Sequence, residues 1–307
     1  MDIASFVLVL MGLSFFETIT SVDNAIINAQ VLATMRPWAR RWFLLWGLLF
    51  AVFVVRGLLP WLIVWAATPS LGPVDALMAT FGNNAATHQA IEKSAPVLLI
   101  GGGVFLIFLF FHWLFVEPKH YGLAAESFFQ KQGIWFFAVV AVLLAVVVWF
   151  ALHKDPMMAF GAVTGSTAFF VMHGFREQAK QAEEHLIQGG LSDWSKILYL
   201  EVIDTTFSID GVLGAFAFTM SVPLILLGNG LGALVVRQLT IGNIERIGRY
   251  KYLKNGAMYS VLFLGLFMVM ESFGAHVPVW ASPAVTFGAV GFFFLKSRAA
   301  LTQAHTP

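Results

Sequence analysis

Two segments of the chain carry the same arrangement of side chains that could bind a cation. In each, an acid precedes a Ser-x-Asp triplet by four residues, and the second copy follows the first by 187 positions. The residues are Glu17, Ser21, Asp23 and Asn24 in the first segment, and Glu201, Asp204, Ser208 and Asp210 in the second. Carboxylate, hydroxyl and amide oxygens suit manganese, calcium or magnesium better than copper or zinc. The chain has no Cys and neither segment has a His, so the pattern predicts a hard divalent-cation site.

On a regular helix, only some of these residues would lie on the same face. At about 100° per residue the upstream acid, the Ser and the residue after the Asp share one stripe, which Asn28 extends in the first copy. The Asp of each triplet lies about 240° from the upstream acid, off that stripe. A helix break near the triplet would let it converge on the same site. Gly211 tolerates the backbone angles of such a break, and Asn24 is the next best residue in the first copy.

The elements that position these residues are membrane helices. Hydrophobic residues make up 59% of the 307 and charged residues only 11%, against about 45–50% and 25% in soluble domains. This composition excludes a soluble enzyme and a nucleic-acid binder, and we expect no enzyme activity and no permanently bound cofactor. A span needs about 20 apolar residues. The sequence predicts an all-α transmembrane bundle of nine spans: 3–33, 42–65, 97–116, 134–152, 157–175, 197–220, 222–244, 257–273 and 280–295.

The positive charges support this number of spans. Fourteen of the 18 Lys and Arg fall in the odd-numbered connections and the C-terminal tail, two fall in the even-numbered connections, and Arg56 and Arg237 lie within spans. Cytoplasmic loops are enriched in Lys and Arg. We therefore expect the N-terminus outside and the C-terminus in the cytoplasm. A polar stretch, 176–195, is interpreted as a solvated linker helix between two halves.

The duplicated motif predicts an inverted repeat in a single transmembrane domain. Val-Val-Arg follows each motif in the next span, ending at Arg56 and at Arg237. The motif spans are the first and the sixth, so they cross the membrane in opposite directions, as in many secondary transporters. The repeat halves are about 1–116 and 196–296, joined by helices at about 117–195. An unpaired acid in mid-membrane costs roughly 2.5–3.5 kcal/mol. The motif acids must therefore be protonated, paired with the two Arg, or bound to a cation.

Glu-x3-Ser-x-Asp-Asn-Ala, Glu-x2-Asp-x2-Phe-Ser-x-Asp-Gly-Val and the Arg that follows each resemble the TerC family of integral membrane proteins, in particular a long-chain subgroup known as a domain of unknown function. That family belongs to the LysE-like exporter superfamily, and members are implicated in exporting manganese. The resemblance implies a multi-pass protein of the bacterial inner membrane. It also implies ion-binding roles for six positions: Glu17, Asp23, Asn24, Glu201, Asp204 and Asp210. His112, where the subgroup often has an acid, and Glu271 depart from the pattern and are accessory candidates.

Three functions remain open at this stage. The first is a secondary transporter that exports a divalent cation, with manganese favoured, by proton antiport. The second is a non-transporting scaffold in a metal or tellurite stress-response complex, in which the acids and Arg form a structural network. The third, by superfamily analogy, is an exporter of small organic solutes. The carried ion, the coupling ion and the oligomeric state are not determined by the residues.

Overall fold

The computed structural model describes residues 2–47, 49–68, 72–74, 85–188, 192–242 and 249–303. Within these ranges the chain forms helices and no strands. The helices are α1 (Ile3–Thr20), α2 (Val22–Ala33), α3 (Pro37–Trp42), the π-helical η1 (Phe43–Gly47) and η2 (Phe50–Val55), α4 (Arg56–Ala67), α6 (Ala85–Phe115), α7 (Ala124–Lys131), the 3₁₀ turn η3 (Gly133–Trp135), α8 (Phe136–Lys154), α9 (Pro156–Gln188), α10 (Asp193–Ala215), α11 (Val222–Gly242), α13 (Leu253–Ser272) and α14 (Ala281–Gln303).

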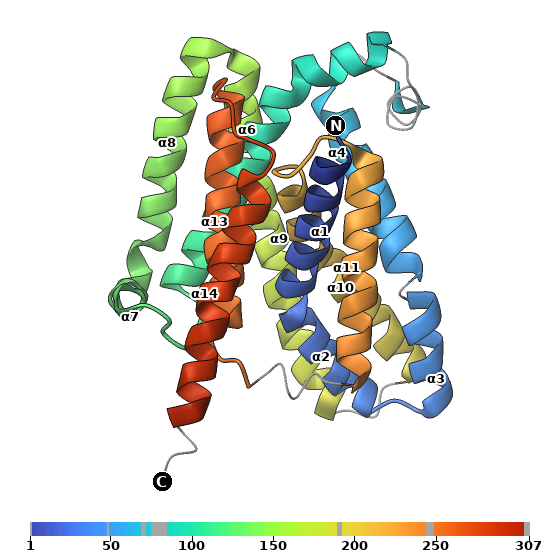
Figure 1. The fold of residues 1–307 in the computed structure, drawn as a ribbon. Coiled ribbons are helices and arrows are strands. Elements are labelled where there is room, and N and C mark those ends of the chain that lie inside the picture. The colour runs from blue at the N-terminus through green and yellow to red at the C-terminus, as the bar shows by residue number, and fades with distance from the viewer. Residues whose placement is uncertain are drawn as a thin grey trace.

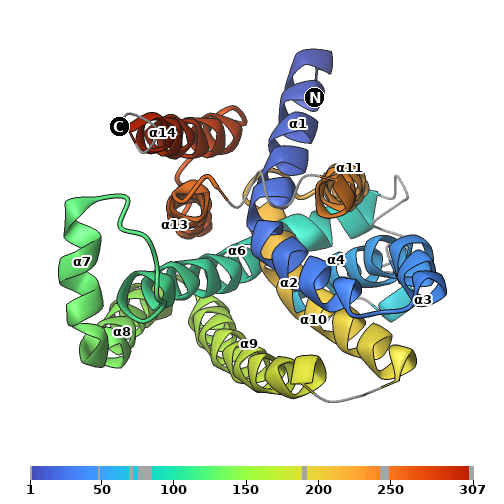
Figure 2. The same cartoon turned by 90° about the horizontal axis from the view of Figure 1, so that it is seen from below.

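The helices form a bundle with α6 and α10 near its centre (Figures 1 and 2). Helix α6 packs on α9 and α13, and α1 packs on α11 and α14. The crossing of α6 and α9 is close because Gly101 meets Gly161 and Gly165, where an added Cβ would collide with opposing backbone. This is the close packing expected where small residues meet in membrane helices. Trp113 and Phe105 of α6 are fully buried in the resulting core.

The all-α polytopic fold is confirmed. Seven described helices are long and apolar enough to cross a membrane. The two other predicted spans also form helices, but the second is divided among α3, η1, η2 and α4, and the sixth, α10, carries several acids. One boundary prediction was wrong: α9 continues without a break through 176–188. Arg176 therefore belongs to this helix and not to a separate linker.

The two motif helices differ in their backbone. Helix α1 ends at Thr20, Ser21 forms a turn, and α2 begins at Val22, so the predicted break occurs in the first copy. Helix α10 runs unbroken from Asp193 to Ala215, so a break at Gly211 is not observed. Gly211 instead provides space: an added Cβ there would overlap the carboxylate of Glu17.

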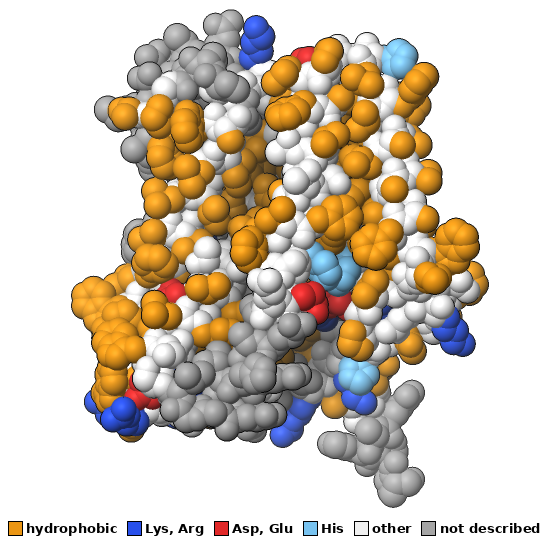
Figure 3. All heavy atoms as spheres, turned by 180° about the vertical axis from the view of Figure 1, so that it is seen from behind, with side chains coloured by type: hydrophobic (Ala, Val, Ile, Leu, Met, Phe, Trp, Pro, Cys, Tyr) orange, Lys and Arg blue, Asp and Glu red, His pale blue; other side chains and the backbone are white. Residues whose placement is uncertain are grey.

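The surface of the bundle matches a multi-pass membrane protein. Hydrophobic side chains cover most of the face in Figure 3, and Lys and Arg gather mainly at the end that carries the C-terminus. The two termini lie at opposite ends of the molecule (Figure 1), as an odd number of spans requires. Which end faces the cytoplasm remains a prediction from the charge distribution.

Candidate functional site

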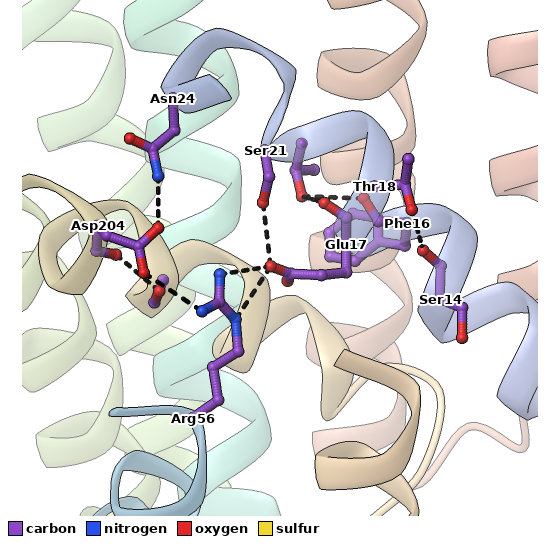
Figure 4. Close-up of polar contacts among 10 residues, drawn as sticks. Ser14, Phe16, Glu17, Thr18, Ser21, Asn24, Arg56 and Asp204 are labelled. Carbon is purple, nitrogen blue, oxygen red and sulfur yellow. Dashed lines mark hydrogen bonds and ion pairs between the residues drawn. The ribbon is translucent and has the colours of Figure 1, made fainter. Parts of the chain in front are cut away.

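Arg56 connects the two motif helices. Its side chain is almost completely buried, and Figure 4 shows the guanidinium between the carboxylates of Glu17 and Asp204. Nε and Nη2 donate to Glu17 Oε1 at 3.0 and 2.7 Å, and Nη1 lies 3.4 Å from Asp204 Oδ2. The π-helical segment η2 ends at Val55, immediately before Arg56, and η1 lies one turn or more upstream, ending at Gly47. Such widened turns are frequent at functional sites because they redirect side chains.

Two polar residues of the broken helix complete this contact. Ser21 Oγ donates to Glu17 Oε1 at 3.0 Å, and Asn24 Nδ2 donates to Asp204 Oδ1 at 2.6 Å (Figure 4). A carboxylate accepts hydrogen bonds only, so the Asn24 amide must present its NH₂ group to Asp204 and direct its oxygen elsewhere. The turn at Ser21 thus allows α1 to supply Glu17 and α2 to supply Asn24 to the same site.

A cavity of about 60 Å³ lies beside Arg56, between α2, η1, η2, α10 and α11. We call it the Arg56 cavity. Its polar lining consists of Ser21, Asn24, Asn28, Arg56, Glu201, Asp204 and Arg237. Three buried oxygens of these residues have no hydrogen-bond donor in the described part of the chain: Oδ1 of Asn24, Oδ1 of Asn28 and Oε1 of Glu201. Arg237 Nε is likewise buried without an acceptor there. Most buried polar groups in proteins have a partner.

Ser208 and Asp210 of the second motif do not line this cavity. Ser208 Oγ donates to the backbone oxygen of Asp204 at 2.6 Å, so its hydroxyl is occupied within α10. Asp210 lies on another face of α10 and forms an ion pair with Arg176 of α9. The side chain of Asp23 lies outside the described residues.

The two accessory candidates lie in other places. His112 is buried in α6, with Nδ1 3.6 Å from Glu117 Oε1 and its ring 4.2 Å from that of His173. Glu271 lines a different cavity, near the end of α10 at Phe216 to Met220. Neither lines the Arg56 cavity.

Sequence reasoning missed three residues around Asp210. Arg176, Glu117 and Lys254 line one cavity with Asp210, and Lys254 Nζ lies 2.7 Å from Glu117 Oε2. All three were assigned to connections because charges flank the apolar runs. The available signal for Arg176 was the helix-compatible sequence that continues from the fifth span through 176–188.

Glu117 is the acid of this group that lies outside the predicted spans, and its surroundings shift its pKa. Burial raises the pKa of Glu117, but the hydrogen bond with His112 and the charge of Lys254 outweigh burial, and the net pKa lies well below its usual range. Glu117 is therefore ionised at neutral pH and connects α13 to the end of α6.

Carboxylates alone do not form a metal cage in this arrangement. Among the described residues, no three His, Cys, Asp or Glu side chains are grouped so that they could hold a metal ion. A cation in the Arg56 cavity would need the amide oxygens of Asn24 and Asn28 in addition to Asp204 and Glu201. Amide and carboxylate oxygens together are the ligands of hard cations.

Comparison with known proteins places the chain in a family. The sequence pattern of DUF475, described as a protein of unknown function, matches residues 22–303. The chain belongs to the DUF475 family. A relative from Bacillus subtilis (strain 168), described as "Uncharacterized membrane protein YceF", is 29% identical over 85 residues, which are 28% of this chain and 33% of that protein. The match thus spans about a third of the relative's length. No solved structure matches the chain. These findings identify a multi-pass membrane protein of the DUF475 family.

Proposed function

We propose that this DUF475 protein is a secondary transporter that exports a divalent metal cation, with manganese as the favoured ion, by proton antiport. The three donor-less oxygens around the Arg56 cavity are the observation that supports a cation. A buried acceptor without a donor is costly, at about 1–3 kcal/mol. A bound cation would remove that cost for each of the acceptors that it contacts. The direction of transport and the preference for manganese rest on the resemblance to the TerC family.

The charges of the site favour a cation over an anion. Glu17, Asp204 and Glu201 supply three carboxylates, and Arg56 and Arg237 supply two guanidinium groups, so the ionised site has one excess negative charge. Arg56 stands between two carboxylates, where it competes with an incoming cation. We propose that cation binding moves Arg56 away from Asp204, whose contact at 3.4 Å is the longer of the two. Arg56 would return when the cation leaves.

The position of the site is suited to alternating access. Helices α1 and α2 belong to the first predicted repeat half and α10 to the second, and the cavity lies at their interface. In transporters built from inverted repeats, the substrate site lies where the repeats meet and one helix is interrupted. The turn at Ser21 is such an interruption.

The size of the cavity argues against an organic solute. Pockets for small organic ligands have volumes of about 300–1,000 Å³, whereas the Arg56 cavity holds about 60 Å³. By this measure a cavity needs about 10–15 Å³ to hold one water molecule. The cavity therefore has room for an ion with a few waters.

The test is cation flux into proteoliposomes that contain the full chain. Manganese, calcium and magnesium uptake is measured for wild type, Asp204→Asn and Glu201→Gln. Asp155→Asn is the matched control because this exposed acid lies between α8 and α9. We expect uptake of at least one divalent ion, a loss of tenfold or more in the two cavity variants, and no change in the control. Folded wild type without flux of any divalent ion would favour the scaffold instead.

A further inference from the structure

A second group of charged residues lies in the bundle, apart from the Arg56 cavity. Asp210 and Arg176 form an ion pair whose side chains are 13% and 12% exposed. They line a cavity of about 70 Å³ with Glu117 and Lys254, which we call the Asp210 cavity. The lining of the Asp210 cavity shares no residue with that of the Arg56 cavity. Ser21 lines the Arg56 cavity, whereas its chain neighbours Thr20 and Val22 line the Asp210 cavity.

The Asp210 cavity offers a cation fewer oxygen ligands than the Arg56 cavity does, because its described lining includes no Asn. Two acids, Asp210 and Glu117, stand with two bases, Arg176 and Lys254, so the ionised group is neutral. A divalent cation placed there would meet two positive side chains at close range. A proton carries a single charge and needs only one oxygen. Asp210 Oδ1 is buried and has no hydrogen-bond partner among the described residues.

We propose that Asp210 carries the coupling proton, at a site separate from the one that binds the metal cation. This proposal rests on the proposed function and assigns the second half of its cycle. When Asp210 is ionised, Arg176 neutralises it. When an incoming proton binds a carboxylate oxygen, Asp210 becomes neutral and Arg176 is left facing Glu117 across the same cavity. Release of the proton to the opposite side restores the ion pair, so one O–H bond forms and breaks per cycle.

A chain of polar side chains extends from this cavity. A neighbouring cavity shares Leu109, Glu117 and Arg176 with it. His112 lies 3.6 Å from Glu117, and the His112 and His173 rings are 4.2 Å apart. The titratable and charged groups around Asp210 come from four parts of the chain: Glu17 of α1, His112 of α6 with Glu117 after it, His173, Arg176 and Glu177 of α9, and Lys254 of α13. The described lining from α1 and α2 is uncharged.

The experiment separates cation exchange from proton coupling in proteoliposomes. Exchange of labelled manganese for unlabelled manganese needs no net proton movement, whereas net manganese transport against a pH dye reports coupling. Wild type, Asp210→Asn, Asp204→Asn and the control Asp155→Asn are compared, and a thermal unfolding midpoint establishes that each variant is folded. Asp210→Glu keeps a titratable group. The double variant Asp210→Asn with Arg176→Gln removes both charges and avoids an unpaired buried Arg.

We expect Asp210→Asn and the double variant to keep exchange within about threefold of wild type and to lose at least tenfold in proton-coupled transport. Asp210→Glu should recover coupling. Asp204→Asn should lose both activities. Loss of exchange in Asp210→Asn to the extent seen in Asp204→Asn would overturn the proposal, as would retained coupling. Wild type without exchange of any divalent ion would instead refute the proposed function, and this assignment with it.

Discussion

The Arg56 and Asp210 cavities contain related sequence motifs but differ in structure. In the first, an Arg bridges acids from both motif helices, and amide oxygens lie nearby without donors. In the second, the Asp of the second motif pairs with an Arg from a helix outside both predicted repeat halves. The lining of the first cavity includes the amides of Asn24 and Asn28, and the described lining of the second includes no amide side chain. The comparison indicates that two similar motifs stand in different environments.

The backbone explains why the copies differ. The first motif is interrupted at Ser21, which lets α1 and α2 present Glu17 and Asn24 to one site. The second motif lies on a continuous helix, so Asp204 and Asp210, six residues apart, face different sides of α10. The backbone conformation around each Ser-x-Asp triplet therefore determines where its Asp lies.

The largest expected effect is the difference in unfolding free energy between substitutions of Glu17, beside the Arg56 cavity, and of Asp210. Glu17→Gln leaves the buried Arg56 with Asp204, at 3.4 Å, as its charged partner, and breaking one side of a buried ion pair costs about 3–5 kcal/mol. Asp210→Asn should cost less because Arg176 still faces Glu117. Reversible unfolding in mixed micelles, followed by Trp fluorescence, measures both free energies. Glu17→Gln combined with Arg56→Gln should recover part of the loss. Equal losses for the two single variants would remove the contrast.

Filling the space that Gly211 leaves for the Glu17 carboxylate should lower the free energy of unfolding by a smaller amount. Gly211→Ala places a methyl group against the Glu17 carboxylate, and overpacking costs about 1–3 kcal/mol. Gly288→Ala in α14 is the matched control, because an added Cβ there meets nothing within 4 Å. That control should be neutral or stabilising by up to about 1 kcal/mol. The same unfolding assay applies, and a neutral Gly211→Ala would mean that Glu17 does not pack against α10.

The pH dependence of stability should show that the lining of the Asp210 cavity contains an ionised acid, Glu117. The pKa of Glu117 is lowered in the folded protein, so its contribution is present above the unfolded pKa and is lost as pH falls through the acid range. Glu117→Gln should therefore cost about 1.5 kcal/mol at pH 7, as for a hydrogen bond to a charged group. The difference from wild type should shrink below about pH 4. A difference that does not change with pH would exclude the ionised Glu117 as its source.

The smallest contrast involves the repeat-related serines. Ser21 donates to the Glu17 carboxylate, whereas Ser208 donates to a backbone oxygen in its own helix. Ser21→Ala should reduce stability by about 1 kcal/mol and weaken cation binding. Ser208→Ala should leave cation binding unchanged. Parallel binding titrations of the two variants check this, and an equal effect would indicate that the serines have equivalent roles.

Composition and charge distribution were sufficient to predict the class of fold. Runs of apolar residues and the alternation of Lys and Arg predict an all-α membrane bundle, because the bilayer imposes length and polarity directly on the sequence. The stripe of Glu17, Ser21 and Asn24 likewise follows from helical periodicity, and the structure brings these residues together at Arg56.

The partners of Asp210 could not be predicted in the same way. Arg176 reaches Asp210 through the packing of α9 on α10, and Lys254 reaches Glu117 through that of α13 on α6. These are contacts between helices distant in sequence, for which periodicity gives no register. The expectation that Arg237 pairs with a motif acid as Arg56 does also depended on the similarity of the two sequence motifs. Arg237 lines the Arg56 cavity, with its Nε unpartnered among the described residues.

The most direct test of the division between the cavities is manganese binding to the purified full chain, followed by electron paramagnetic resonance of the free ion. We expect Asp204→Asn to weaken binding at least tenfold and Asp210→Asn to change it by less than threefold, with Asp155→Asn as the unaffected control. Equal weakening in Asp204→Asn and Asp210→Asn would show that both Asp residues serve one cation site, and would contradict the division.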